Sequence, residues 1–295
     1  MKSFFSENVL KEILKSEDDP KNINNFISQE DCNELLELRK SIKNKMVDRE
    51  ESTKVAFNFE QSDISKKLKK KVEEKIGEFY VNDFEPHFIT TRFPLRLHVD
   101  TGKNPNDTIY KNVVIPLEFV YQNKNENKKK PNTIIFKNKW YERSALFTKK
   151  TSNNYDFIIK DSVGNFVDIT NIHNFKKKID EVENGEIIYE GNKFFVNNIF
   201  KDYIKMLSKT KRYNIRTDKH IINKKNFDKI IYEKYMSHQP YEDCQGLELD
   251  KALEWNVGNL IYWDRIRIHS SDNFLKNNIF SKTAIALFTS KTKIN

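Results

Sequence analysis

The stretch 92–100, which reads Arg-Phe-Pro-Leu-Arg-Leu-His-Val-Asp, constrains the fold more than any other part of the chain. Apolar residues alternate with the others from position 93 to position 99, which predicts a strand with one buried face. His98 and Asp100 are two residues apart, so both side chains project from the opposite face. Turn formers at 101–105 end the strand. An imidazole beside a carboxylate at a strand end provides two of the three ligands of a two-histidine, one-carboxylate iron site.

The same pair also fits an ordinary hydrogen-bonded surface pair, because the metal site requires a third ligand. The far end of the chain is therefore informative. The segment 253–264 reads as strand, turn and strand, His269 follows it, and 283–289 is an apolar final strand.

Further short strands are expected near 113–120 and 133–136, with turn residues between them. Strands at such short intervals are typical of an antiparallel barrel or jelly roll and not of alternating strand–helix units. Pro116 lies within the first of these strands, which indicates an edge strand or a bulge. The sequence thus predicts a mainly β fold.

Flanking helices and one long insertion complete the predicted organisation of a single domain, 1–295. Residues 1–85 form an N-terminal helical region, with apolar residues at helical spacing near 4–15, 28–43 and 64–79. The insertion, about 143–249, separates core strands and shows no obvious second hydrophobic core. It is either a lid or substrate-selecting element or an addition without a catalytic role.

Composition limits the partners and the cellular setting. The net charge is +9, but it is carried by scattered lysines, so a nucleic-acid partner is compatible with the sequence and is not favoured. Cys32 and Cys244 lie far apart and predict neither a disulfide framework nor a zinc site. No segment has the length and apolar character of a membrane span or a signal peptide, so we expect a cytoplasmic protein without membrane contact.

Taken together, these pieces resemble the Fe(II)/2-oxoglutarate-dependent dioxygenases, most closely the prolyl-4-hydroxylase-like and phytanoyl-hydroxylase-like branches. The matching segments are 23–32, 98–100 and 258–263, then His269 and a basic residue beside the last strand. The resemblance implies a double-stranded β-helix (a cupin-like jelly roll). It also implies that His98, Asp100 and His269 are the catalytic residues that hold Fe(II), with 2-oxoglutarate and O2 as cosubstrates.

The same resemblance places a basic residue against the distal carboxylate of 2-oxoglutarate. Lys282 is the best match, although the family more often has Arg at a slightly shorter spacing from the second His. Other basic residues therefore remain candidates: Arg92, Arg267, Arg265 and Lys291. An arginine would offer a bidentate fork to the carboxylate, whereas Lys282 would offer a point charge.

The function implied is hydroxylation of a small molecule or an amino-acid side chain, with decarboxylation of 2-oxoglutarate to succinate. Two alternatives stay open: a nucleic-acid-modifying oxygenase of the same chemistry, and a non-catalytic cupin-like metal-binding module. Four further histidines have no assigned role and are expected to be surface or internally bonded residues: His87, His173, His220 and His238.

Overall fold

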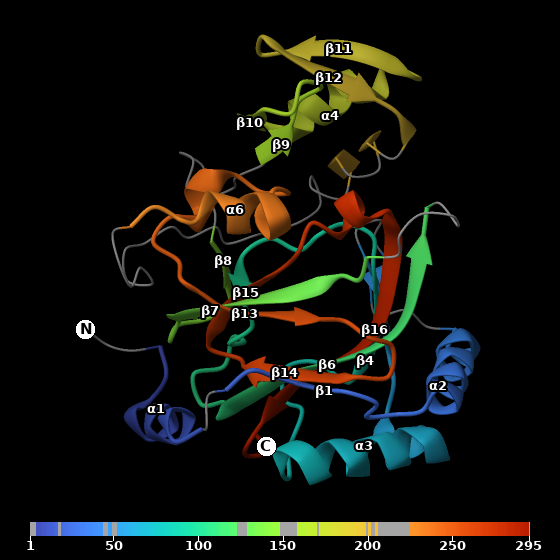
Figure 1. Ribbon diagram of the computed structural model, residues 1–295, viewed down its shortest axis with the longest axis vertical. Coiled ribbons are helices and arrows are strands. Elements are labelled where there is room, and N and C mark those ends of the chain that lie inside the picture. Colours follow the sequence, from blue (N-terminus) through green and yellow to red (C-terminus); the bar gives the residue numbers. More distant parts are fainter. Residues whose placement is uncertain are drawn as a thin grey trace.

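Two antiparallel sheets face each other and form the body of the molecule (Figure 1). This computed structural model describes residues 4–16, 19–43, 47–48, 52–122, 129–147, 158–169, 171–198, 200–201, 204–205 and 225–294. The larger sheet has the order β1-β14-β6-β16-β4-β3-β2, and the smaller has the order β13-β7-β15-β5-β8.

The strands of the larger sheet are β1 (Lys21–Ile23), β2 (Val47–Asp48), β3 (Ser52–Ala56), β4 (His87–Thr91), β6 (Ile109–Tyr121), β14 (Leu260–Asp264) and β16 (Ile279–Ser290). Those of the smaller sheet are β5 (His98–Val99), β7 (Asn132–Lys139), β8 (Ala145–Leu146), β13 (Leu249–Glu254) and β15 (Arg267–Ser271).

The path of the chain between the sheets identifies the fold. From β4 to β7 successive strands alternate between the larger and the smaller sheet, and from β13 to β16 they alternate again. Two interleaved sets of four strands wound in this way make a jelly roll, or double-stranded β-helix. The predicted fold class is confirmed.

The predicted strand over 92–100 is wrong in length, although its facing is right. Only His98 and Val99 belong to β5, and the residues before them are not in a strand. Pro94 has no N–H to give to a ladder, and the N–H of Leu97 donates to the Gln239 side chain at 3.0 Å and not to a strand. Leu97 and Val99 are nonetheless buried on the face opposite His98.

Pro116 marks a bulge in a central strand and not an edge. β6 lies between β14 and β16, so it has a partner on both sides. Pro116 is opposite Ala284, directly beside a register shift between Thr283 and Ala284. The carbonyl of Pro116 accepts a hydrogen bond of 2.9 Å from the N–H of Gly258.

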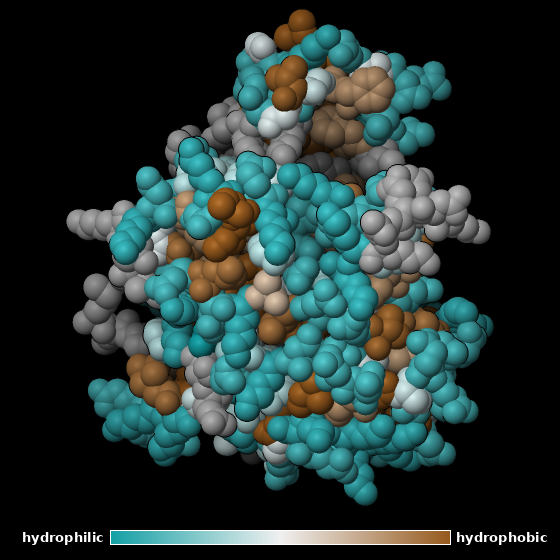
Figure 2. Space-filling model, viewed as in Figure 1, coloured by the Kyte–Doolittle hydropathy of each residue, from teal (hydrophilic) through white to brown (hydrophobic). Residues whose placement is uncertain are grey.

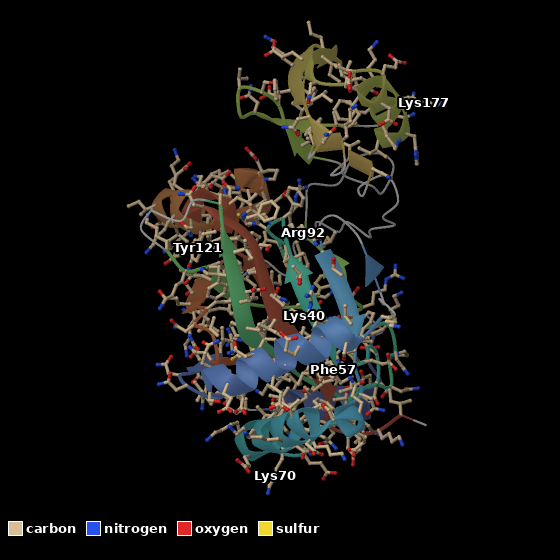
Figure 3. The ribbon with its side chains drawn as sticks, turned by 90° about the vertical axis from the view of Figure 1, so that its right-hand side faces the viewer. Lys40, Phe57, Lys70, Arg92, Tyr121 and Lys177 are labelled. Carbon is tan, nitrogen blue, oxygen red and sulfur yellow. The ribbon has the colours of Figure 1, made fainter. Side chains whose placement is uncertain are left out.

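Helices α2 (Gln29–Ser41) and α3 (Asp63–Ile76) cover the outer face of the larger sheet. Each begins at a serine whose hydroxyl accepts a backbone N–H, Ser28 for α2 and Ser62 for α3. Figure 3 shows both helices across this face, with Lys70 on the solvent side of α3. A separate short helix, α1 (Glu7–Leu14), packs its buried Val9 and Ile13 against a small cluster of its own.

The opposite, inner face of the larger sheet meets the smaller sheet. One buried cluster joins Ile261 and Ala284 of the larger sheet to Ile135 and Leu253 of the smaller, and the partly buried Val114 packs against it. Because side chains alternate along a strand, Val113 and Ile285 point to the outer cluster under α2 and α3 instead. This alternation fixes which side chains line the interior of the barrel.

The insertion has a hydrophobic core of its own, contrary to expectation. Its described elements are β9 (Ile158–Lys160), β10 (Phe166–Asp168), α4 (Ile172–Asp180), β11 (Gly185–Tyr189) and β12 (Asn192–Val196). Phe175, Phe194 and Ile179 are at most 1% exposed and form the centre of a separate cluster. We call residues 158–205 the outer lobe; it lies at one end of the molecule in both ribbon views (Figures 1 and 3). The sequence did not indicate this core because its apolar residues come from several short elements, none of which shows a long periodic pattern.

The end of the insertion returns to the barrel. α6 (Lys229–Ile231) leads into a π-helical turn, Tyr232–Met236, and a short 3-10 helix, Tyr241–Cys244. Figure 2 shows a mostly hydrophilic face with hydrophobic side chains gathered over α6, where Ile230 is 80% exposed. No helix in the ranges described is long and apolar enough to cross a bilayer.

Candidate metal centre

Adjacent strands of the smaller sheet bring the three predicted ligands together. His98 of β5 and His269 of β15 are direct cross-strand partners, and their ring centroids are 4.1 Å apart. Asp100 follows β5, and its Oδ2 lies 3.8 Å from Nε2 of His98 and 3.0 Å from Nε2 of His269. One ligand atom from each residue lies within 4.8 Å of the other two.

Hydrogen bonds to the backbone fix both imidazoles in the same tautomer. Nδ1 of His98 lies 2.6 Å from the carbonyl oxygen of Arg96, and Nδ1 of His269 lies 3.0 Å from that of Arg267. A carbonyl can only accept, so Nδ1 carries the proton and Nε2 of the neutral ring presents its lone pair. In the neutral form of each ring, the Nε2 lone pair therefore faces the carboxylate of Asp100.

Electrostatics keeps the groups in the states that bind metal. Burial, reinforced by the neighbouring His269, lowers the pKa of His98 to about 4. Burial acts to raise the pKa of Asp100, but His98, His269 and Arg265 outweigh it and hold that pKa well below its usual range. At neutral pH the site therefore contains a neutral imidazole at His98 and a carboxylate at Asp100.

Asn112 and Arg265 hold the carboxylate ligand from two sides. The Asn112 amide donates to Oδ2 of Asp100 at 3.1 Å. Nε of Arg265, whose side chain is 1% exposed, donates to the backbone carbonyl of Asp100 at 2.8 Å. Partners of this kind orient metal ligands and tune their basicity.

The Arg265 guanidinium is itself surrounded by acceptors. It forms ion pairs with Asp83 and Asp107 and reaches the carbonyl of Thr289 at 3.3 Å. Gly102, at φ +79°, is required beside it because a Cβ there would collide with the Asp83 carboxylate. The turn after the carboxylate ligand is thus fixed by a buried charge network.

Lys282 lies inside the barrel in an aromatic setting. Its side chain is 2% exposed, and Nζ lies 3.8 Å from the centroid of the Trp255 ring and 4.9 Å from that of Phe274. Burial lowers its pKa to about 8, partly opposed by the charge of Asp272. Within the described part of the chain, Nζ has no hydrogen-bond acceptor and no ion-pair partner.

The other basic candidates have different surroundings. Arg267 pairs with Asp250 at 2.6 Å and donates to the Phe136 carbonyl at 3.1 Å. Arg92 donates to Thr53 Oγ1 at 3.3 Å, and Lys291 is exposed above the Tyr110 ring. Arg265 is committed to the network around Asp100. Among the described residues, neither Lys282 nor Lys291 has a hydrogen-bond acceptor or ion-pair partner for its ammonium, and of these two only Lys282 is buried.

Three polar residues near the site were missed or set aside at the sequence level: Asn112, Trp263 and His87. Asn112 contacts a ligand directly, and the Trp263 ring packs edge-on against His269 at 4.9 Å. His87 is fully buried, not a surface residue. No local motif signals any of them, because each reaches the site only through strand pairing.

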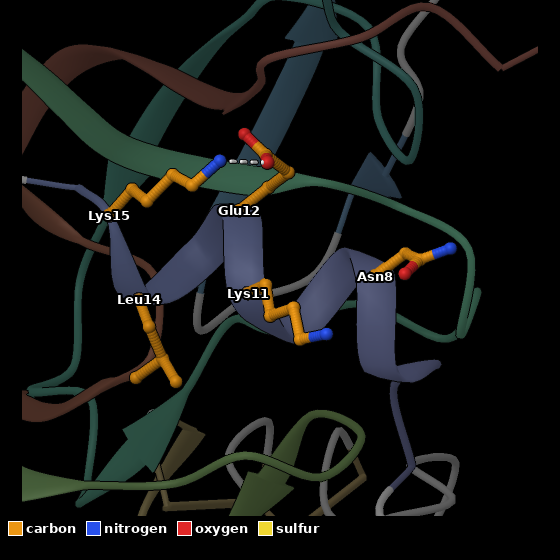
Figure 4. A pocket seen from close by; sticks show the side chains of 5 residues that line it. All are labelled: Asn8, Lys11, Glu12, Leu14 and Lys15. Carbon is orange, nitrogen blue, oxygen red and sulfur yellow. Dashed lines mark hydrogen bonds and ion pairs between the residues drawn. The ribbon is translucent and has the colours of Figure 1, made fainter.

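The remaining histidines lie apart from the triad. His173 is exposed on α4, and His220 lies outside the described residues. His238 approaches the carbonyl of Leu95 at 3.2 Å and Ser270 Oγ at 3.4 Å, so it joins the end of the insertion to the segment before β5 and to β15 itself. A surface hollow on α1, shown in Figure 4, is lined by one helix only and contains no ligand residue. We assign no role to that hollow.

Comparisons with known proteins give fold-level likenesses only. No family model and no curated protein matches the chain. Among solved structures, the epimerase SnoN in complex with Fe3+, alpha ketoglutarate and nogalamycin RO is 8% identical, with 95% of this chain and 83% of that chain covered and a TM-score of 0.42. The alpha ketoglutarate-dependent carbocyclase SnoK from nogalamycin biosynthesis is 8% identical, with 98% and 86% covered and a TM-score of 0.42. HygX from Streptomyces hygroscopicus, with nickel and 2-oxoglutarate bound, is 7% identical, with 96% and 87% covered and a TM-score of 0.40.

Proposed function

We propose that this chain is an Fe(II)- and 2-oxoglutarate-dependent oxygenase that acts on a small molecule. The observation that carries the proposal is the convergence of Nε2 of His98, Nε2 of His269 and Oδ2 of Asp100 within 4.8 Å, with the Nδ1 atom of each imidazole bonded to a backbone carbonyl. Acceptors held this close repel one another unless a cation lies among them. Two imidazoles and one carboxylate on one side, with other coordination positions left open, suit Fe(II) in oxygenases.

Lys282 supports the assignment of the cosubstrate. A buried ammonium without an acceptor is costly, and an incoming carboxylate would supply the missing partner. The apolar side chains of Ile89, Val114 and Ala284 belong to the same inner cluster as Trp255, which borders Lys282. Such walls fit the methylene groups of a dicarboxylate, so we assign Lys282 to the distal carboxylate of 2-oxoglutarate and place Arg92 and Arg267 second.

The residues of this chain would then divide the work. His98, Asp100 and His269 would hold the metal, which with 2-oxoglutarate and O2 supplies the oxidising chemistry. Asn112 and Arg265 would keep Asp100 oriented, and Lys282 would orient the cosubstrate. The two sheets would limit the access of water to the metal, since His269 is 4% exposed and the side chains of His98 and Asp100 are 17% and 24% exposed.

The reaction we favour is hydroxylation of a small molecule or an amino-acid side chain, with formation of succinate. Other outcomes remain candidates, since the solved structures that resemble the fold include an epimerase and a carbocyclase. The choice among these outcomes depends on where the substrate is held relative to the metal. The outer lobe and the segment 227–247 are the elements that we propose for substrate selection.

The test is anaerobic binding of Fe(II) and 2-oxoglutarate. Binding is monitored by the absorbance of the weak visible charge-transfer band of the complex. Wild type is compared with His269→Ala, Lys282→Met and Lys276→Met, a surface lysine that serves as the matched control. We expect the band in wild type and Lys276→Met, its loss in His269→Ala and a much higher 2-oxoglutarate requirement in Lys282→Met. Absence of the band in wild type that retains metal would refute the proposal.

A further inference from the structure

Strand register places three polar side chains on the inner face of the larger sheet. Trp263 of β14 is the cross-strand partner of Asn112 of β6. Ala286 of β16 pairs with His87 on one side and with Val114 on the other, and Val114 is two residues from Asn112. Paired residues share a face and the period along a strand is two, so His87, Asn112 and Trp263 all point to the same side.

Contacts across the barrel show that this side is the one with the ligands. Asn112 bonds to Asp100, and Trp263 packs on His269. The His87 ring lies 5.7 Å from that of Phe288, which is the cross-strand partner of Asn112. Asp100 is near enough to His87 to act on it electrostatically.

Each of the three residues has a buried polar atom without a partner among the described residues. These atoms are Nε2 of His87, Oδ1 of Asn112 and Nε1 of Trp263. A buried polar group left unpaired destabilises the folded protein, because it has lost its hydrogen bonds to water and gained none in return. Three such atoms on one inner face beside the candidate metal centre indicate a surface built for a ligand and not a satisfied core.

The chemistry of two of these atoms is fixed by their other contacts. Nδ1 of His87 lies 2.9 Å from the carbonyl oxygen of Glu85, so it is protonated and Nε2 is an acceptor in the neutral ring. Burial, with the nearby Lys54 ammonium, lowers the pKa of His87 to about 4 and keeps the ring neutral. The amide nitrogen of Asn112 must face the Asp100 carboxylate, so the atom that points away from Asp100 is the carbonyl oxygen.

We infer that His87 and Asn112 form an acceptor surface that binds hydroxyl or amino groups of the organic substrate beside the metal. This inference rests on the proposed function. Two acceptors cannot bind a carboxylate, so this surface is distinct from the cosubstrate pocket at Lys282. It selects polar molecules that bear O–H or N–H donors next to the carbon that reacts. Of the three unpaired atoms, Nε1 of Trp263 is the donor, and it could bind a hydrogen-bond acceptor on the same substrate molecule.

The test uses Mn(II) as a paramagnetic probe of what binds next to the metal. Nuclear magnetic relaxation of small molecules is measured with Mn(II)-loaded protein for glycerol, L-serine and further polyols and hydroxy amino acids, each paired with its O-methyl ether. We expect the parent compounds to be relaxed at least about fivefold more than their ethers, because the ethers leave the buried acceptors unpaired.

Two variants separate substrate binding from a structural role of His87. His87→Asn retains a donor for the Glu85 carbonyl but removes the inward acceptor, whereas His87→Gln retains the inward acceptor and loses the donor to Glu85. We expect the preference for parent compounds to vanish in His87→Asn and to persist in His87→Gln, with the fold of both checked by urea unfolding.

Three results would overturn the inference: no compound relaxed by wild type, no preference for the parent compounds, or a preference that His87→Asn retains. Failure of the proposed function is seen separately. Electron paramagnetic resonance of free Mn(II) measures how much Mn(II) the protein binds. Wild type should bind Mn(II), and His269→Ala should not. A wild type that does not retain Mn(II) overturns both conclusions.

Discussion

Replacing Lys282 by Met should make the protein without cosubstrate more stable while it weakens cosubstrate binding. Burial lowers the pKa of Lys282 from 10.5 to about 8. Each pH unit corresponds to about 1.4 kcal/mol, so the buried ammonium disfavours folding by about 3.5 kcal/mol when it is fully protonated. Met fills similar space beside Trp255 and Phe274 without a charge, so most of this penalty should disappear.

The dependence on pH gives the prediction a signature. Below pH 8 both the native and the unfolded chain hold the proton, and the penalty is complete. Between pH 8 and 10.5 the native protein releases the proton first, so the penalty declines, and above 10.5 it is absent. The stability advantage of Lys282→Met should therefore be largest near neutral pH and should shrink as the pH rises through 8.

Urea unfolding, monitored by circular dichroism, measures the difference in unfolding free energy between wild type and Lys282→Met at pH 7 and at pH 9.5. Addition of 2-oxoglutarate with metal should stabilise wild type in proportion to the logarithm of its concentration and should leave the variant nearly unchanged. A variant that is equally or less stable than wild type at pH 7 would refute the reasoning, because the ammonium would then have a partner that compensates its burial.

Other predictions concern the groups around Asp100 and the ligands themselves. Arg265→Met should weaken Co(II) binding about 10- to 100-fold in a chelator competition. The control Lys111→Met breaks another buried ion pair and should change Co(II) affinity less than about threefold. Equal losses in the two variants would contradict the role of Arg265 in positioning Asp100. Gly102→Ala should lower the unfolding free energy in urea by about 1–3 kcal/mol, since φ is positive and the Asp83 carboxylate occupies the space; an unchanged value would mean that this turn is freely adjustable. Because burial lowers the pKa of His98 to about 4, the His98 ring should remain neutral down to about pH 5 in the metal-free protein, as measured by nuclear magnetic resonance titration of its ring protons; a midpoint near pH 6.5 for these protons would contradict the burial of His98.

Local sequence pattern was enough to find two candidate ligands, His98 and Asp100, at one strand end. His98 and Asp100 are two residues apart, and a period of two determines their common facing even though β5 is much shorter than the predicted strand. The position of His269 required the resemblance to a family, since nothing between 100 and 269 indicates which strand pairs with β5. The structure supplies that pairing directly.

The residues that the sequence could not reveal depend on long-range register. His87, Asn112 and Trp263 come from three strands, and only the ladders through β16 and β6 bring them to one face. The core of the outer lobe was missed for a related reason. Its apolar side chains are spread over strands of three to five residues and one short helix, and none of these shows a long periodic pattern.

The direct pairing of His98 with His269 also has a consequence for how the chain folds. The two imidazoles meet only when a strand from the end of the chain closes against one from its first half, and β5 contributes one cross-strand pair, His98 with His269, to that ladder. Closing such a large loop is entropically expensive and comes late when contacts are mainly non-local. A metal ion would therefore bind almost only the assembled barrel. Added metal should lower the rate of unfolding, and it should leave the rate of the early folding steps unchanged.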